Sequence, residues 1–384
     1  AVMIGTILIG MGQIMEAVTQ GALSKEVVIP TAAAIIIIYG TAGGLVAAAW
    51  TDVLQGILII VLSFMLLPPL FREVGGLAGL HEALPAQAFS LAWPAGDDAA
   101  RSIGLFAIFM LFVNGMLGAL IEPQSQTKQA ANDEWTLRLG VQIGTIMKRI
   151  CTVAWALVGL CAAAIWPNLQ NPEMAFGLAT RSYLPDGLTG LMLASMMAAG
   201  MSTTDAIMVS GAAIFSRNLY ARHVCRTGSD EHYLRAARLT GVFLVCAGLG
   251  AAFWLGTVTK AIEFWWKITA FIGPTFLLGM FLRRGNSWGA WACVVTSALV
   301  WWLTEHDAIV SASDHRWDTV WYQASLYLPA GIAAYIIVSY MTPPEDEAKL
   351  NRFFARLNTP VGQEEVLIAA GMEPNSEEIL PGAN

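Results

Sequence analysis

Two adjacent hydroxyl residues inside a long apolar segment are the clearest chemical signal in this chain. The segment, residues 195–213, is rich in Ala, Gly and Met. On a helix, residues three, four and seven positions apart share a face. Converging oxygens on such a face suit a small hard cation, whereas the structural alternative is a helix contact whose hydroxyls bond back to carbonyls one turn earlier. The residues of this face are Ser195, Ala199, Ser202, Thr203, Ala206 and Ser210.

A second apolar segment carries a single acid. Asp52 is the only charged residue between positions 27 and 67. A carboxylate at the centre of a membrane helix costs about 2.5–3.5 kcal/mol on insertion scales, so it needs a partner or a polar cavity. Gly44, Ala48 and Gly56 share its helix face at intervals of four. The carboxylate either locks helix packing through a hydrogen bond or binds a coupling cation, and the small-residue face favours the cation.

The elements that hold these residues are membrane helices. Hydrophobic residues make up 56% of the chain and charged residues 13%, against about 25% charged in soluble domains. The mean hydropathy is +0.59. The net charge of −7 suggests no nucleic-acid partner, and the five cysteines show no metal or disulfide spacing. Since no nucleophile–base cluster or metal-ligand cluster lies at membrane depth, we do not expect an enzyme.

Apolar runs of spanning length predict about ten helices. The run 27–67 would make a helix of about 60 Å, twice a bilayer core, so we expect a break at Gly40 or at Gly43-Gly44. Residues 68–101 are expected to form a polar loop. The chain begins inside an apolar run, and we expect further spans to precede it. The other expected spans are 1–22, 102–121, 139–165, 189–216, 239–257, 262–282, 287–304 and 324–341.

Charges in the loops predict the orientation. The loops 122–149, 217–238 and 283–286 carry eleven Lys and Arg, whereas the alternate loops carry six, so the first set is expected in the cytoplasm. We expect a transmembrane domain over 1–343 and a cytoplasmic tail over 344–384. In the tail, one short amphipathic helix is predicted from the spacing of Leu350, Phe353, Phe354 and Leu357.

Three motifs resemble the sodium:solute symporter family, which includes sodium/sugar, proline and pantothenate symporters. They are GGLVAAAWTDVLQ at 43–55, AAGMST at 198–203 with IFSRNLY at 214–220, and FIGPTFLLGMFLRRGNSWGA at 271–290. The resemblance implies an all-α integral membrane protein with the inverted-repeat, LeuT-like bundle of sodium-coupled transporters, here without its first core helices. It also implies Na⁺ as the coupling ion.

The resemblance assigns roles to individual residues. In the family, a sodium site takes the backbone carbonyl and hydroxyls at the positions of Ala199, Ser202 and Thr203, and some members hold a second sodium near Asp52. Lys128 stands near a position where many members have Arg. Further polar residues are open to two interpretations. Gln13 and Asn114 either contact the substrate or form interhelical hydrogen bonds. Asp205, one turn beyond Ser202, is either a site residue or a helix contact. Glu263 and Lys267 are expected to form a structural ion pair.

The predicted function is sodium-coupled symport of a small polar solute, of the sugar, amino acid or organic acid class. The protein is expected to be a multi-pass protein of the cell membrane. Its expected partners are the solute and the bilayer, with no obligate protein partner. The alternative is a transporter-like solute sensor without net transport. A tail of about forty residues after position 343 is too short for a kinase domain, which disfavours the sensor.

Overall fold

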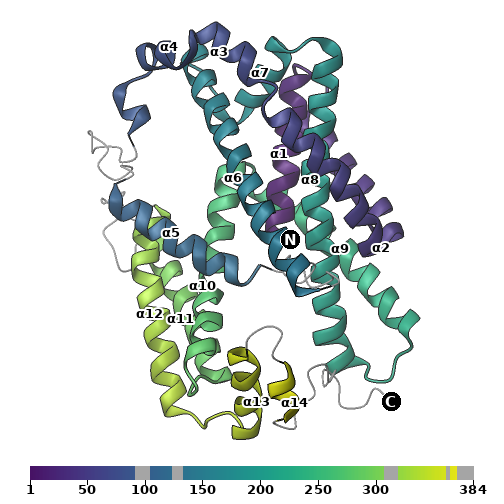
Figure 1. Cartoon of the computed structure of the whole chain (residues 1–384), viewed down its shortest axis with the longest axis vertical. Helices are drawn as coiled ribbons and strands as arrows, with labels where there is room; N and C mark the ends of the chain where they lie inside the picture. Colours follow the sequence, from purple (N-terminus) through teal and green to yellow (C-terminus); the bar gives the residue numbers. More distant parts are fainter. Residues whose placement is uncertain (91–103, 123–132, 307–318, 360–363, 370–384) are drawn as a thin grey trace. The chain divides into compact units, whose positions relative to one another are not determined.

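The computed structural model describes residues 1–90, 104–122, 133–306, 319–359 and 364–369, and every regular element among them is a helix (Figure 1). Lys128 lies outside the described residues. The principal helices are α1 (Val2–Val18), α2 (Lys25–Ser63), α3 (Leu67–Val74), α4 (Gly76–Ala83), α5 (Leu105–Leu120), α6 (Glu134–Ile165), α7 (Ala175–Tyr183), α8 (Asp186–Ile214), α9 (Asp230–Leu255), α10 (Val258–Phe281), α11 (Ser287–Glu305), α12 (Val320–Met341), α13 (Glu347–Asn358) and α14 (Glu364–Ala369). Short 3₁₀ turns occupy Ala86–Phe89 and Pro172–Met174, and a π-helix, η5, occupies Phe215–Val224.

The predicted membrane character is confirmed by the length and composition of these helices. Within the described ranges, six helical segments are long and apolar enough to cross a membrane. Two shorter apolar helices, α1 and α5, accompany them. The observed bounds of α6, α8, α9, α10 and α12 contain or closely match the expected spans.

Two expectations about α2 and the following loop are wrong. The structure assigns one α-helix to all of residues 25–63, so no helix end occurs at Gly40 or Gly43-Gly44. A glycine disfavours a helix by only about 0.5–1 kcal/mol relative to Ala, which apolar neighbours on both sides outweigh. The expected loop after position 68 begins with two short helices, α3 and α4. Pro68 stands at the start of α3, and Gly75, at a φ of 85°, ends it.

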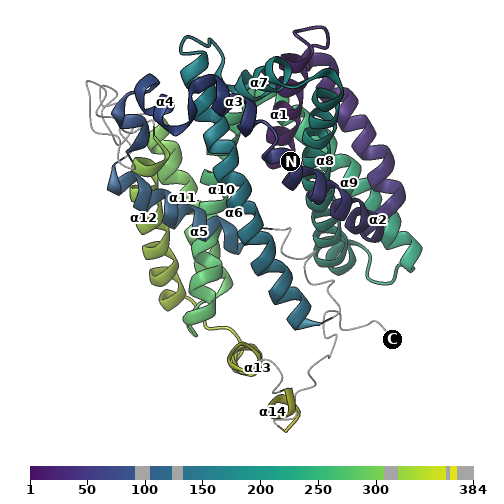
Figure 2. The same ribbon diagram turned by 45° about the horizontal axis from the view of Figure 1, so that its top comes forward.

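The chain forms two compact units, described here separately. The first comprises residues 1–88 and 123–262, and in it α1, α2, α8 and α9 pack against one another (Figure 2). Its core includes Ile4, Leu8, Ile36 and Val245, all fully buried. A Cβ at Gly5 would lie 2.8 Å from the backbone oxygen of Gly248, so α1 and α9 touch backbone to backbone, as small residues allow in membrane helices.

The second unit comprises residues 89–122 and 263–384. Here α11 packs along α12, and α12 contacts α5. The predicted tail helix is α13, and it is held against the turn between α10 and α11. The Arg283 guanidinium lies over the ring of Phe354, 5.1 Å from its centroid, and hydrogen-bonds Asn351. Ser287 donates its hydroxyl to Glu345, 3.0 Å away, which fixes the segment leading into α13.

Candidate cation site

The helix α8 positions the predicted cation ligands. Its neighbours approach closely because glycines face them: a Cβ at Gly200 would lie 2.4 Å from the sulfur of Met11 on α1. Pro185 precedes the helix and Thr189 returns its hydroxyl to Leu184 O at 3.0 Å, which anchors the first turn. The face predicted from the sequence is therefore held in a packed four-helix environment, where its hydroxyls keep fixed positions.

Three of the predicted ligands meet at one point of α8. The hydroxyls of Ser202 and Thr203 both donate to the carbonyl oxygen of Ala199, each at 3.1 Å. We call these three oxygens the α8 oxygen trio. These are the back-bonds of the structural alternative, yet they leave lone pairs of both hydroxyls free to accept an ion. Oxygens about 2.3–2.6 Å from a hard cation and about 80° apart are themselves about 3.1 Å apart, so the two distances to Ala199 O are compatible with a shared cation.

Two carboxylates lie beside the same helix pair. Asp205, one turn beyond the trio, is only 2% exposed, and its Oδ1 has no hydrogen-bond partner among the described residues. On α2, Asp52 is half-buried and its Oδ1 is likewise buried without a partner in the described chain. The two carboxylates interact electrostatically. Since like charges repel and buried charges need partners, this arrangement would be stabilised by a cation.

Close packing between α2 and α8 brings Asp205 to this position. A Cβ at Gly40 would lie 2.9 Å from Asp205 Oδ1, so only glycine leaves room for the carboxylate. The adjacent Tyr39 donates its hydroxyl to Met201 O at 3.4 Å and also lies near Asp205. Sequence reasoning missed Tyr39, although an aromatic hydroxyl beside a glycine in an apolar run was a visible signal.

A cavity of about 310 Å³ borders the trio. Its lining includes Ala199 and Ser195 from α8, Ile14 from α1 and Ser63 from α2. The indole of Trp155 on α6 donates to Ser63 at 2.9 Å and closes one wall. The lining is mainly apolar, and of the trio residues it includes Ala199 but neither Ser202 nor Thr203.

The two predicted substrate contacts lie in different surroundings. Gln13 on α1 is 4% exposed, its Oε1 lacks a hydrogen-bond partner in the described residues, and its side chain contacts Glu173. In the second unit, Asn114 accepts a hydrogen bond from Tyr327 at 2.8 Å and donates to Trp266 O at 3.4 Å. These bonds join α5 to α12 and α10, so the geometry favours interhelical bonding for Asn114.

Lys267 has a different partner from the one expected. Its ammonium lies 3.4 Å from Glu305 on α11, and Gln323 on α12 donates to the same carboxylate oxygen at 3.0 Å. The ammonium also lies 5.6 Å from the ring centroid of Trp301. The expected pair with Glu263 is therefore corrected. Lys267 is 7% exposed, and it turns inward to the carboxylate and the aromatic face that the fold supplies.

Comparison with known proteins agrees with this fold. The chain matches the family described as SSF, Sodium:solute symporter family, over residues 2–296. It is 26% identical to the osmoregulated proline transporter OpuE of Bacillus subtilis, with 71% of this chain and 56% of the relative covered. It is 26% identical to the sodium/pantothenate symporter of Escherichia coli, with 69% and 56% covered. For the sodium/sialic acid symporter NanT of Aliivibrio fischeri, the identity is 25%, with 82% and 63% covered.

A solved structure supports the predicted fold. The chain superposes on a Na⁺-coupled sialic acid symporter, described in a substrate-bound outward-open state with a novel Na⁺-site, with a TM-score of 0.70 and 16% identity. The match covers 89% of this chain and 72% of that one. The predicted LeuT-like helical fold is thereby confirmed. The chain spans a little over half the length of the curated relatives it matches. On these grounds, the chain belongs to the sodium:solute symporter family.

Proposed function

We propose that the protein containing this chain couples the entry of Na⁺ to the uptake of a small polar solute. The observation that carries the proposal is the α8 oxygen trio one turn before the buried Asp205, whose carboxylate interacts with that of Asp52. Oxygen ligands and buried negative charge are what a hard monovalent cation needs in a low-dielectric site. The family of the chain supports Na⁺ as the ion.

The residues divide into two groups by their chemistry. Neutral oxygens of Ala199, Ser202 and Thr203 would hold the first Na⁺. These neutral ligands leave the positive charge of the ion unbalanced between α2 and α8. The carboxylates of Asp52 and Asp205 would hold a second Na⁺ or compensate the charge of the first. In either case the bound ion favours the conformation in which α2 and α8 keep this spacing. A ligand shifts a conformational equilibrium only by its differential affinity, and this preference supplies that affinity.

The solute class follows the relatives. Their names give proline, pantothenate and sialic acid, all small and polar. We propose a substrate of this class. No feature of the described residues favours a sensor over a transporter, and we propose transport without a catalysed reaction or an obligate protein partner.

We propose an orientation with the basic loops 217–238 and 283–286 in the cytoplasm of a cell membrane. Membrane proteins retain excess Lys and Arg in short cytoplasmic loops. The tail helix α13 is fixed to the second of these loops, so the tail lies on the same side.

Reconstitution into liposomes tests the proposal. We expect labelled proline, pantothenate or sialic acid to accumulate under an inward Na⁺ gradient and to show counterflow at equal Na⁺ on both sides. Replacement of Na⁺ by choline should abolish accumulation. Na⁺-dependent solute binding without uptake or counterflow would instead establish a sensor, and uptake that is independent of Na⁺ would overturn the ion assignment.

A further inference from the structure

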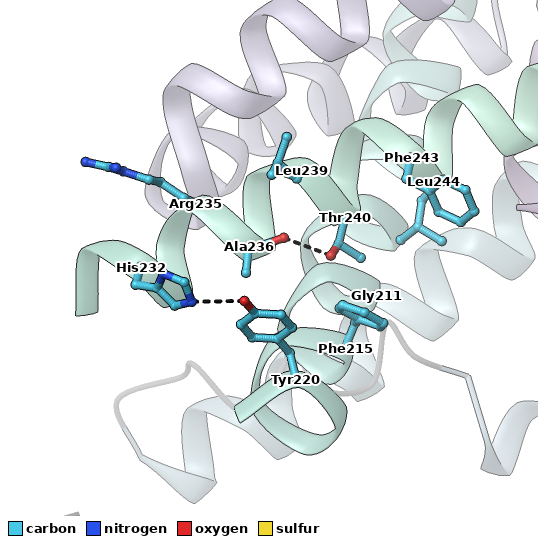
Figure 3. A pocket seen from close by; sticks show the side chains of 10 residues that line it. All are labelled: Gly211, Phe215, Tyr220, His232, Arg235, Ala236, Leu239, Thr240, Phe243 and Leu244. Carbon is cyan, nitrogen blue, oxygen red and sulfur yellow. Dashed lines mark hydrogen bonds between the residues drawn. The ribbon is translucent and has the colours of Figure 1, made fainter. Parts of the chain in front are cut away.

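A groove lies at one end of α8, away from the cation site. We call it the α8–α9 groove: its apolar wall contains Phe215, Leu239, Phe243 and Leu244, and its polar end contains Tyr220, His232 and Arg235. Its volume is about 760 Å³, within the range of about 300–1,000 Å³ for ligand pockets. In Figure 3, His232 and Tyr220 are joined by a hydrogen bond, the Arg235 side chain extends outward beyond them, and Phe215, Phe243 and Leu244 lie on the opposite side.

Small residues and an irregular helix hollow out the groove. Gly211 on α8 and Ala236 on α9 line it without filling it. Between them the chain follows the π-helix η5, whose wider turns carry Phe215 and Tyr220. Such π-turns occur mostly as short insertions and are frequent at functional sites. The hollow thus lies where small residues line the helices and the backbone is irregular.

The apolar wall is presented to the outside. Leu239 is 71% exposed, Phe243 69% and Phe215 40%. All three lie within the two segments, Asp186–Val224 and Asp230–Leu255, that are long and apolar enough to cross a membrane. The spans expected from the sequence, 189–216 and 239–257, end and begin at this groove, so we place its apolar wall in the hydrocarbon region and its polar end at the membrane boundary.

The polar end offers donors for an anion. His232 and the Tyr220 hydroxyl are joined by a hydrogen bond of 3.0 Å. Arg235 pairs with Glu231 at 3.5 Å, but both side chains are more than three-quarters exposed. An exposed pair of this kind contributes about 0–1 kcal/mol, so a phosphate, which accepts two parallel bonds from Arg, can replace it.

The residues around the polar end carry an excess of positive charge. The segment 217–238 contains five arginines and two acids. A basic cluster adjoining an apolar groove at a membrane boundary matches a ligand with a negative head and an apolar chain, and anionic lipids are attracted to basic pockets on the cytoplasmic side. A peptide helix would need a broad apolar face outside the bilayer, which the location of the wall does not provide.

We propose that the α8–α9 groove binds an anionic phospholipid, with an acyl chain along Phe215, Leu239 and Phe243 and the phosphate at Arg235, His232 and Tyr220. The site is separate from the cation site and does not rest on the transport function. Gly211 of α8, the helix that carries Ser202 and Thr203, lines the groove, so a lipid bound there contacts α8.

Native mass spectrometry of the purified, delipidated protein tests the proposal, with phosphatidylglycerol and phosphatidylcholine of the same chains as probes. Both lipids carry the phosphate, but phosphatidylcholine adds a quaternary ammonium that the arginine-rich segment 217–238 repels, so we expect phosphatidylglycerol to bind at least about tenfold more tightly. Arg235→Gln should remove this preference. Ala236→Phe should fill the groove and abolish the tight binding event while retaining every charge.

Two matched variants serve as controls. Arg181→Gln removes an exposed arginine of a similar ion pair, with Asp186, at the other end of α8. Cys246→Phe adds the same ring to an exposed position of α9 that does not line the groove. Both should bind phosphatidylglycerol as the unmodified protein does. Equal binding of the two lipids, unchanged binding by Ala236→Phe, or full displacement by millimolar inorganic phosphate would each overturn the proposal, the last by identifying a free-anion site.

Discussion

Replacement of Thr203 by Val removes one oxygen of the trio and almost nothing else. Valine has nearly the shape of threonine, so the helix packing is kept, and the lost hydroxyl donates only to Ala199 O. Thr204 provides the matched control because its hydroxyl makes the same back-bond, to Gly200 O at 2.8 Å, at a fully buried position outside the trio. Each variant therefore loses one helix back-bond, but only Thr203→Val loses a proposed cation ligand.

The expected magnitude follows from the strength of one charge-assisted contact. A bond to a charged group contributes about 1.5–3 kcal/mol, or a factor of roughly 10–150 in affinity. Thr203 is half-buried, so solvent screens part of the interaction and we expect the lower end, about tenfold. The Na⁺ concentration for half-maximal solute uptake should rise by this factor in Thr203→Val and change less than about twofold in Thr204→Val.

Na⁺ titrations of uptake in proteoliposomes, at saturating solute, measure both variants. Ser202→Ala should behave as Thr203→Val does, since it removes a second member of the trio. Equal shifts in the Thr203 and Thr204 variants would refute the reasoning, because the effect would then belong to helix packing. An unchanged Na⁺ dependence in all three would refute the ligand assignment itself.

Three further predictions concern pH, packing and stoichiometry. Burial raises the pKa of Glu173, but hydrogen bonds from Thr259 and its neighbours outweigh it and hold that pKa below the ordinary 4.5. The resulting stabilisation is present above pH 4.5 and is lost as pH falls through the lowered folded-state pKa, a loss that Glu173→Gln should abolish in thermal melts. Gly273→Ala should destabilise by about 1–3 kcal/mol, since its Cβ would lie 2.5 Å from a backbone oxygen of α5. If the unmodified protein couples two Na⁺ per solute, Asp52→Asn should reduce this number to one, measured by reversal potentials.

Each of these has its own control or contrary outcome. Gly250→Ala, where nothing lies within 4 Å of the new Cβ, should be neutral or stabilising by about 0.5–1 kcal/mol in the same melts. Equal melting temperatures for both glycine variants would contradict the packing argument. A stoichiometry of one Na⁺ in the unmodified protein would limit Asp52 to a structural or coupling role. An acid transition that persists unchanged in Glu173→Gln would assign it to another group.

The sequence predicted the parts of this structure that depend on local pattern. Helix periodicity placed Ser202 and Thr203 on one face of α8, and the motifs identified the family. Pairings across the chain left no such pattern: the bond between Asn114 and Tyr327 joins residues 213 positions apart. Lys267 shows the same limit, since its neighbour at i−4 was visible in the sequence and Glu305, which it contacts, was not.

The sequence could not predict that α2 is one continuous helix, and the reason is physical. The run 27–67 is longer than a bilayer is thick, which suggested a break. Helical hydrogen bonds join residues four positions apart, however, so their formation does not depend on the thickness of the bilayer. Conversely, α3 and α4 are short helices whose few residues carry too little periodicity to stand out from a polar loop.

The back-bonds of the trio have a consequence for ion selectivity. Ser202 and Thr203 are consecutive residues of a continuous helix, and both hydroxyls are tied to the oxygen that completes the trio. The three oxygens can spread apart only if these bonds lengthen or the turn deforms. If the trio binds a cation, a larger alkali ion would sit farther from these oxygens, because the helix resists spreading them around it. The geometry of this one helical turn would thus contribute to a preference for Na⁺ over K⁺.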